Sequence, residues 1–114
     1  MRSVISPGER TSPSERSRAA LRTAELLRRS ADITRQQAEL TLQRAEISRA
    51  LAASEEEEAK HTRDPNHAAP RAQRVKLLED EARVLTAEAM TLQKESERLL
   101  AQAKTAEQRG RLNS

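Results

Sequence analysis

The chain has 114 residues, is 35% hydrophobic and 34% charged with a net charge of +3, and contains no cysteine, phenylalanine, tryptophan or tyrosine. The lack of cysteine excludes disulfides and cysteine-ligated metals, and the lack of aromatic residues argues against a thick layered core. Alanine and leucine instead favour long helices that touch along narrow seams. No apolar run approaches the ~20 residues of a membrane span and no signal-peptide segment follows Met1, so a cytoplasmic protein is expected.

Residues 1–11 combine serine, proline, glycine and arginine without a periodic pattern, which predicts a flexible, disordered basic arm. A helix start follows directly. Ser12 can cap the helix, Pro13 suits the first helical position, and Glu15 completes a capping box. The first helix is therefore predicted over residues 12–60.

This first helix carries two apolar stripes on nearly opposite sides. One consists mainly of small residues at spacings of three and four: Ala20, Ala24, Leu27, Ala31, Thr34, Ala38, Thr41, Ala45, Ser48 and Ala52. The other, which we call the outer stripe, consists of large aliphatic residues: Leu26, Ile33, Leu40, Ile47 and Leu51. A helix with two apolar sides is expected to have two neighbours.

Residues 61–69 are predicted to form a turn, because Asp64-Pro65-Asn66 is a turn signal. A second helix is predicted over 70–109, with Pro70 near its start and Gly110 capping its end before a tail at 110–114. Spacings of three and four over four heptads are typical of a helix packed along one seam. The residues at these spacings are Val75, Leu78, Ala82, Leu85, Ala89, Leu92, Ser96, Leu99, Ala103 and Ala106.

A turn centred near Pro65 pairs residues whose numbers add up to about 130. This register sets alanine against leucine in four layers: Ala31 with Leu99, Ala38 with Leu92, Ala45 with Leu85, and Ala52 with Leu78. It also brings Glu56 near Arg74 and Glu58 near Arg71. The predicted fold class is all-α, a long antiparallel two-helix coiled-coil hairpin with an alanine/leucine seam.

Catalysis and metal binding are not expected. The chain offers no cysteine or tyrosine nucleophile and no glycine-rich loop, and a narrow helical seam offers no pocket. His61, Asp64 and His67, with Glu57 and Glu58 nearby, are residue types that bind zinc. No fourth ligand is obvious and a proline divides the set, so no metal or cofactor is predicted.

Once the small stripe packs against the second helix, the outer stripe is left exposed, and exposed apolar stripes mark interfaces. We expect a homodimer that forms a four-helix bundle, a helix or groove of another protein being the other partner considered. The predicted function is a non-catalytic protein–protein interaction module: an adaptor, assembly factor or regulatory subunit. The alternative is a nucleic-acid-associated accessory protein that contacts phosphates through Arg10, Arg16, Arg18 and Arg22.

Overall fold

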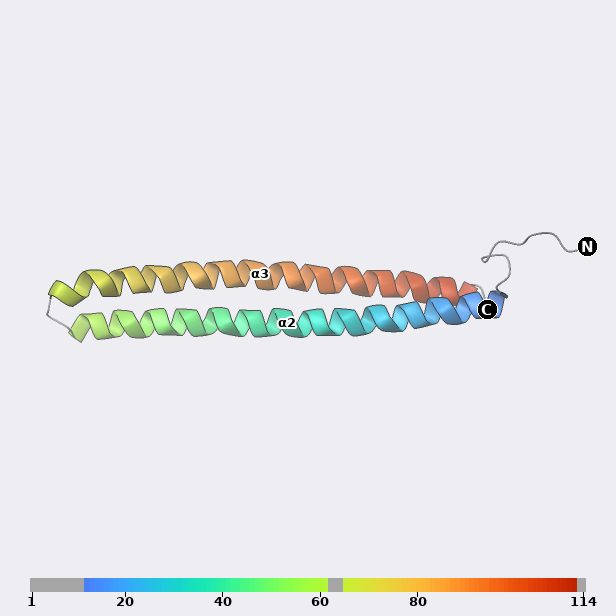
Figure 1. Cartoon of the computed structure of the whole chain (residues 1–114), viewed down its shortest axis with the longest axis horizontal. Coiled ribbons are helices and arrows are strands. Elements are labelled where there is room, and N and C mark those ends of the chain that lie inside the picture. Colours follow the sequence, from blue (N-terminus) through green and yellow to red (C-terminus); the bar gives the residue numbers. More distant parts are fainter. Residues whose placement is uncertain (1–11, 62–64, 113–114) are drawn as a thin grey trace, which may run out of the picture. The chain divides into compact units, whose positions relative to one another are not determined.

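The computed structural model describes residues 12–61 and 65–112, and all of these except Ser12 are helical. Helix α2 spans Pro13–His61 and helix α3 spans Pro65–Leu112 (Figure 1). The described residues contain no strand. The prediction of an all-α helical hairpin is confirmed.

The predicted capping box opens α2. The Ser12 backbone N–H donates to Glu15 Oε2 at 3.3 Å, and the Glu15 backbone N–H donates to Ser12 Oγ at 3.1 Å. Each side chain thus satisfies an amide that the first helical turn leaves without a partner. Such caps typically contribute about 1 kcal/mol to helix stability.

The helix boundaries differ from the predicted ones. Helix α3 begins at Pro65, because a proline at the first helical position loses no hydrogen bond, and Ala68 and Ala69 favour helix. Pro70 therefore lies inside α3. At the other end α3 continues through Gly110, which has no positive φ and so does not act as a left-handed cap. The predicted arm at 1–11 and the turn residues 62–64 lie outside the described residues.

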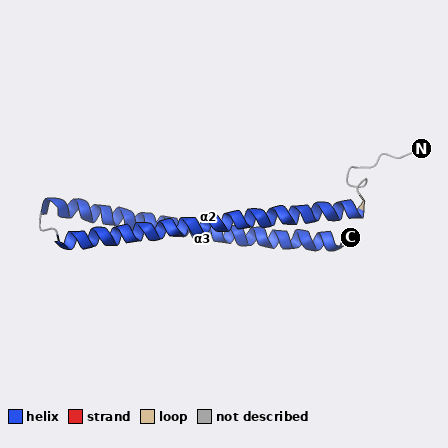
Figure 2. Ribbon diagram, turned by 90° about the horizontal axis from the view of Figure 1, so that it is seen from below, coloured by secondary structure: helices blue, strands red, loops and turns tan. Residues whose placement is uncertain are grey.

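Both helices run through two compact units. Unit 1 consists of residues 12–33 and 95–112, and unit 2 consists of residues 34–61 and 65–94. Within each unit the α2 and α3 segments lie side by side in opposite directions (Figures 1 and 2).

In unit 1 the two helix backbones approach closely. Ala24, Ala31, Ala103 and Ala106 are buried, and the buried Ser96 donates its hydroxyl proton to the Ala31 carbonyl at 2.8 Å. Ser17 donates in the same way to the carbonyl of Gly110. A Cβ atom on Gly110 would lie 3.0 Å from Leu21 Cγ and 3.2 Å from the Ser17 carbonyl oxygen. The absence of a side chain at Gly110 therefore lets the helices approach here without crowding.

In unit 2 the core is a row of small side chains with one buried leucine. The buried apolar residues are Ala38, Ala45, Ala52, Ala82, Leu85 and Ala89. Thr41 is also buried, and its hydroxyl donates to the Gln37 carbonyl of its own helix at 2.8 Å. Because each alanine buries little apolar area, the hairpin is held by many small contacts along its length.

Candidate functional site

The seam residues from both helices meet in the interior of each unit. Ala31, Ala38, Ala45 and Ala52 are all at most 4% exposed. Their leucine counterparts reach the surface to different extents, since Leu85 is buried whereas Leu78, Leu92 and Leu99 are partly exposed. Small residues therefore fill the interior, and the leucines lie over its edges.

The outer stripe lies on the surface in both units. Leu26 and Ile33 in unit 1, and Leu40, Ile47 and Leu51 in unit 2, keep between 50 and 63% of their surface exposed. Leucine and isoleucine are among the residues that folded proteins most often bury. These five residues form the largest regularly spaced set of exposed aliphatic side chains on α2.

Helix α3 contributes two exposed aliphatic residues that were not among the predicted interface residues. Leu77 is 61% exposed and Val84 is 66% exposed, and both belong to unit 2. They lie seven residues apart, which is the spacing of the outer stripe itself. That spacing is the signal that could have identified them.

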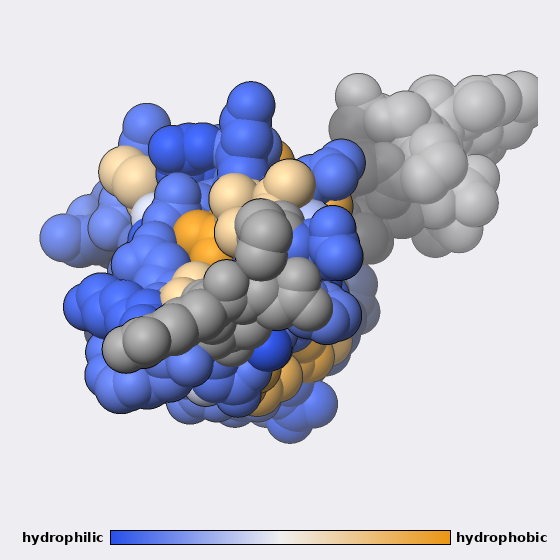
Figure 3. All heavy atoms as spheres, turned by 90° about the vertical axis from the view of Figure 1, so that its left-hand side faces the viewer, coloured by the Kyte–Doolittle hydropathy of each residue, from blue (hydrophilic) through white to orange (hydrophobic). Residues whose placement is uncertain are grey.

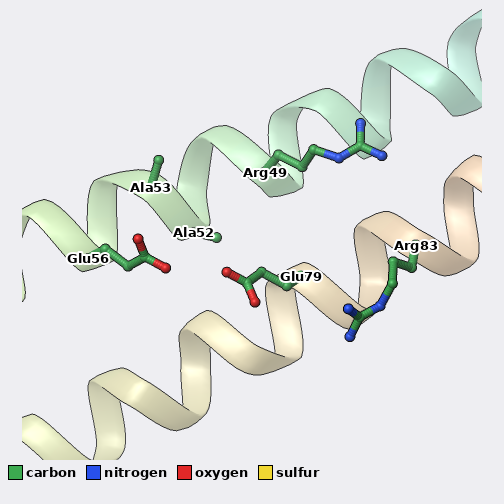
Figure 4. A pocket seen from close by; sticks show the side chains of 6 residues that line it. All are labelled: Arg49, Ala52, Ala53, Glu56, Glu79 and Arg83. Atoms are coloured by element: carbon green, nitrogen blue, oxygen red, sulfur yellow. The ribbon is translucent and has the colours of Figure 1, made fainter.

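One edge of unit 2 carries charged side chains of both signs near Ala52. Arg49 Nη2 donates to Thr86 Oγ1 at 2.6 Å across the two helices. Two helical turns from this hydrogen bond, toward the loop end of the unit, the carboxylates of Glu56 and Glu79 point toward one another beside Ala52 (Figure 4). We call the edge that carries Arg49, Glu56 and Glu79 the Glu56 edge. Arg83, on the same shallow pocket, pairs with Asp80.

Ion pairs join the two helices of unit 2 at its loop end. Arg71 Nη1 lies 2.7 Å from Glu58 and 3.3 Å from Glu55, as the predicted Arg71–Glu58 pair requires. Arg74 lies 3.8 Å from Glu55, which differs from the expected Glu56 partner. The hydrogen bond and charge of Arg71 lower the pKa of Glu58 below its ordinary value. Figure 3 looks onto this end and shows mostly hydrophilic side chains.

The turn histidines do not gather with carboxylates into a metal-type cluster. His61 lies 3.4 Å from Glu57, and both His61 and His67 are exposed. Among the described residues, which do not include Asp64, no group of three histidine, aspartate or glutamate side chains is arranged to hold a metal ion.

The arginines proposed for nucleic-acid contact begin α2 in unit 1. Arg16, Arg18 and Arg22 are exposed, and Arg10 lies outside the described residues. Further along the helix, two arginines form ion pairs with carboxylates. Arg28 pairs with Glu107 of α3, and Arg29 lies 2.7 Å from Glu25.

Neither α2 nor α3 contains a segment that is long and apolar enough to cross a membrane. Comparison of the chain with protein-family models, with curated proteins and with solved structures returned no match. The exposed surface of the described residues is therefore the basis for the proposed function.

Proposed function

We propose that the protein is a non-catalytic protein–protein interaction module that associates through the outer stripe of α2. The observation that supports this proposal is the exposure of five large aliphatic side chains on a helix whose buried side is almost entirely small. The chain itself is the partner that we propose first, and a helix of another protein is the second.

Fully burying a leucine or isoleucine side chain is worth roughly 1.5–3 kcal/mol. The hairpin core cannot use the outer stripe, because the small residues of α2 already face α3. Association is the remaining way to remove these five side chains from water.

The surroundings of the stripe in unit 2 also favour a protein partner. Leu40 and Ile47 line a shallow hollow on α2 together with Gln37, Thr41, Gln43 and Arg44. Of the six residues that line the hollow only Arg44 is charged, whereas 34% of the residues of the whole chain are charged. Depletion of charged residues around apolar anchors is typical of the core of protein interfaces.

The test is the solution mass of the chain, measured by light scattering over a dilution series. We expect a mass of two chains for the unmodified protein. Leu40→Asp with Ile47→Asp should give single chains, because four carboxylates would be buried at the interface of the dimer. Circular dichroism should show that this variant remains helical.

Leu42→Asp provides the matched control. Leu42 is also exposed on α2, but it lines a different hollow, with Met90 of α3. This variant should keep the mass of two chains. Equal dissociation by Leu42→Asp, or a single-chain mass for the unmodified protein at every concentration, would contradict self-association through the outer stripe.

The nucleic-acid alternative is favoured by one observation, the exposure of Arg18 and Arg22 near the start of α2. Binding of this kind weakens as the salt concentration rises, because the release of counterions from the phosphates is then less favourable. Retention of the full chain on DNA at low salt, and its loss in Arg18→Gln with Arg22→Gln, would support it. Absence of retention at low salt would reject it.

A further inference from the structure

Apart from Leu42 of α2, the exposed leucine, isoleucine and valine residues of unit 2 lie on one side of each helix. On α2, Leu40, Arg44, Ile47 and Leu51 follow one another at spacings of four and three, so they share a side. On α3, Leu77, Glu81, Val84 and Glu88 repeat the same spacings. Each helix thus presents aliphatic side chains with charged ones between them.

These two sides belong to the same edge of the hairpin. Arg44 directly precedes the buried Ala45, and Glu81 and Glu88 directly precede the buried Ala82 and Ala89. The Glu56 edge lies across the seam, because its residues directly follow seam positions. In a packed helix pair, residues before and after the seam positions line opposite edges. We call the second edge the Arg44 edge.

The Arg44 edge is apolar on both helices at matching heights. In an antiparallel pair with residue numbers adding up to about 130, Ile47 lies level with Val84, and Leu51 lies close to the level of Leu77. All four side chains are at least 50% exposed. Together with Leu40 they form a two-helix apolar face, which we call the unit 2 face.

The charges of the unit 2 face are segregated by helix. Arg44 lies on α2, and Glu81 and Glu88 lie on α3, all three exposed. Within the described part of the chain none of the three takes part in an ion pair. The cation of one helix and the carboxylates of the other are therefore available to an outside partner.

We propose that the unit 2 face binds the same face of a second copy of this chain, with α2 of each copy against α3 of the other and both loop ends on the same side of the dimer. The inference rests on the proposed self-association and adds its geometry. A twofold axis parallel to the helices sets Ile47 against the partner's Val84 and places Arg44 between the partner's Glu81 and the partner's Glu88.

The charges disfavour the alternative twofold dimer. An axis perpendicular to the helices, which makes the two copies antiparallel, sets α3 against α3. It brings Glu81 and Glu88 toward carboxylates of the same kind and Arg44 toward a second arginine. Like charges facing one another across an interface select against that arrangement.

A single spin label distinguishes the two arrangements. The chain has no cysteine, so Ala69→Cys creates one labelling site, on an exposed position near the start of α3. In the proposed dimer the two labels lie at the same height, within roughly 30 Å, the width of two helix layers with the label arms. In the antiparallel dimer, each label lies fifteen residues from Val84, on opposite sides of the twofold axis. At 1.5 Å per residue the two labels are then separated by about 45 Å along the helices.

The role of α3 is tested by Val84→Asp. We expect its dimer dissociation constant to rise at least about tenfold, since the carboxylate would face the partner's Ile47. Met90→Asp, at an exposed apolar residue of α3 outside this face, should change the constant less than about twofold. Arg44→Glu should weaken the dimer about fivefold, and adding Glu88→Lys to it should restore affinity.

The outcomes separate this inference from the function that it rests on. A dimer with a label distance near 45 Å, or one that Val84→Asp leaves intact, would overturn the proposed arrangement while self-association stands. A single-chain mass at every concentration would overturn both. A short label distance together with sensitivity to Val84→Asp supports both.

Discussion

Units 1 and 2 use the same spacing of buried residues but join their helices differently. In unit 1 the contacts reach the backbone: Ser96 bonds to the carbonyl of Ala31, and Gly110 lies against the carbonyl of Ser17. In unit 2 long side chains bridge the helices, as in Arg49 with Thr86 and Arg71 with Glu58. Small residues thus permit contacts to backbone carbonyls in unit 1, where Arg28 also pairs with Glu107 across the helices, and long polar side chains make the bridging contacts named for unit 2.

The outward surfaces of the two units also differ. Arg98 and Thr105 of α3 in unit 1 occupy the heptad position that Leu77 and Val84 occupy in unit 2. The outer stripe of α2 continues through both units, but near the levels of Leu26 and Ile33 this position of α3 carries polar residues instead of aliphatic ones. The proposed dimer therefore uses unit 2, where exposed aliphatic residues of both helices contribute to one face.

The largest effect on stability is expected from overpacking the seam of unit 2. Ala38→Leu adds three carbons where Ala38 is 4% exposed, and should lower the free energy of unfolding by about 1–3 kcal/mol. Ala87→Leu makes the same change at an exposed position of α3 and should stay within about 0.5 kcal/mol. Urea unfolding of both variants measures the difference, and equal stabilities would contradict the seam assignment.

The next effect concerns the backbone contacts of unit 1. Ser96→Ala removes the hydroxyl that bonds to Ala31 of the other helix and should cost about 0.5–1.5 kcal/mol. Thr105→Ala removes an exposed hydroxyl that bonds only within α3 and should cost less. The same unfolding measurement ranks the two variants, and the reverse order would show that the contact between helices contributes little.

A smaller effect is expected at Gly110. Alanine favours helix over glycine by about 1 kcal/mol, but its Cβ would lie 3.0 Å from Leu21 Cγ. Gly110→Ala alone should therefore give little or no stabilisation. In a Leu21→Ala background the same change should be more favourable than in the unmodified protein, because the Leu21 contact is gone and only the Ser17 carbonyl oxygen, at 3.2 Å, still lies close. A double-mutant cycle measures this coupling, and additivity would argue against close approach at this position.

The smallest effect is a pH dependence that separates ion pairs between helices from those within one helix. Arg71 lowers the pKa of Glu58 from its ordinary 4.5, so this pair stabilises the folded chain above about pH 4.5. The stabilisation is lost as the pH falls through the lowered value. Arg71→Gln should accordingly flatten the decrease of Tm on acidification.

Arg98→Gln tests the matched pair in unit 1. Arg98 lowers the pKa of Glu95, but both residues lie on α3, three positions apart. Arg98→Gln should alter the dependence of Tm on pH less than Arg71→Gln does, because the Arg98–Glu95 pair does not connect the two helices. Equal changes would show that the Arg71 pairs do not join the helices.

The two helices, the capping box at Ser12 and the all-α hairpin were predictable from the sequence, because capping and three–four spacing are local properties of the chain. The antiparallel register also predicted the Arg71–Glu58 pair. The close packing at Gly110, the approach of Arg74 to Glu55 and the edge shared by Leu77, Val84 and Ile47 were not predicted. Each of these features depends on how the side chains of one helix are directed toward the other, which is set by the packing of the helices and not by local spacing.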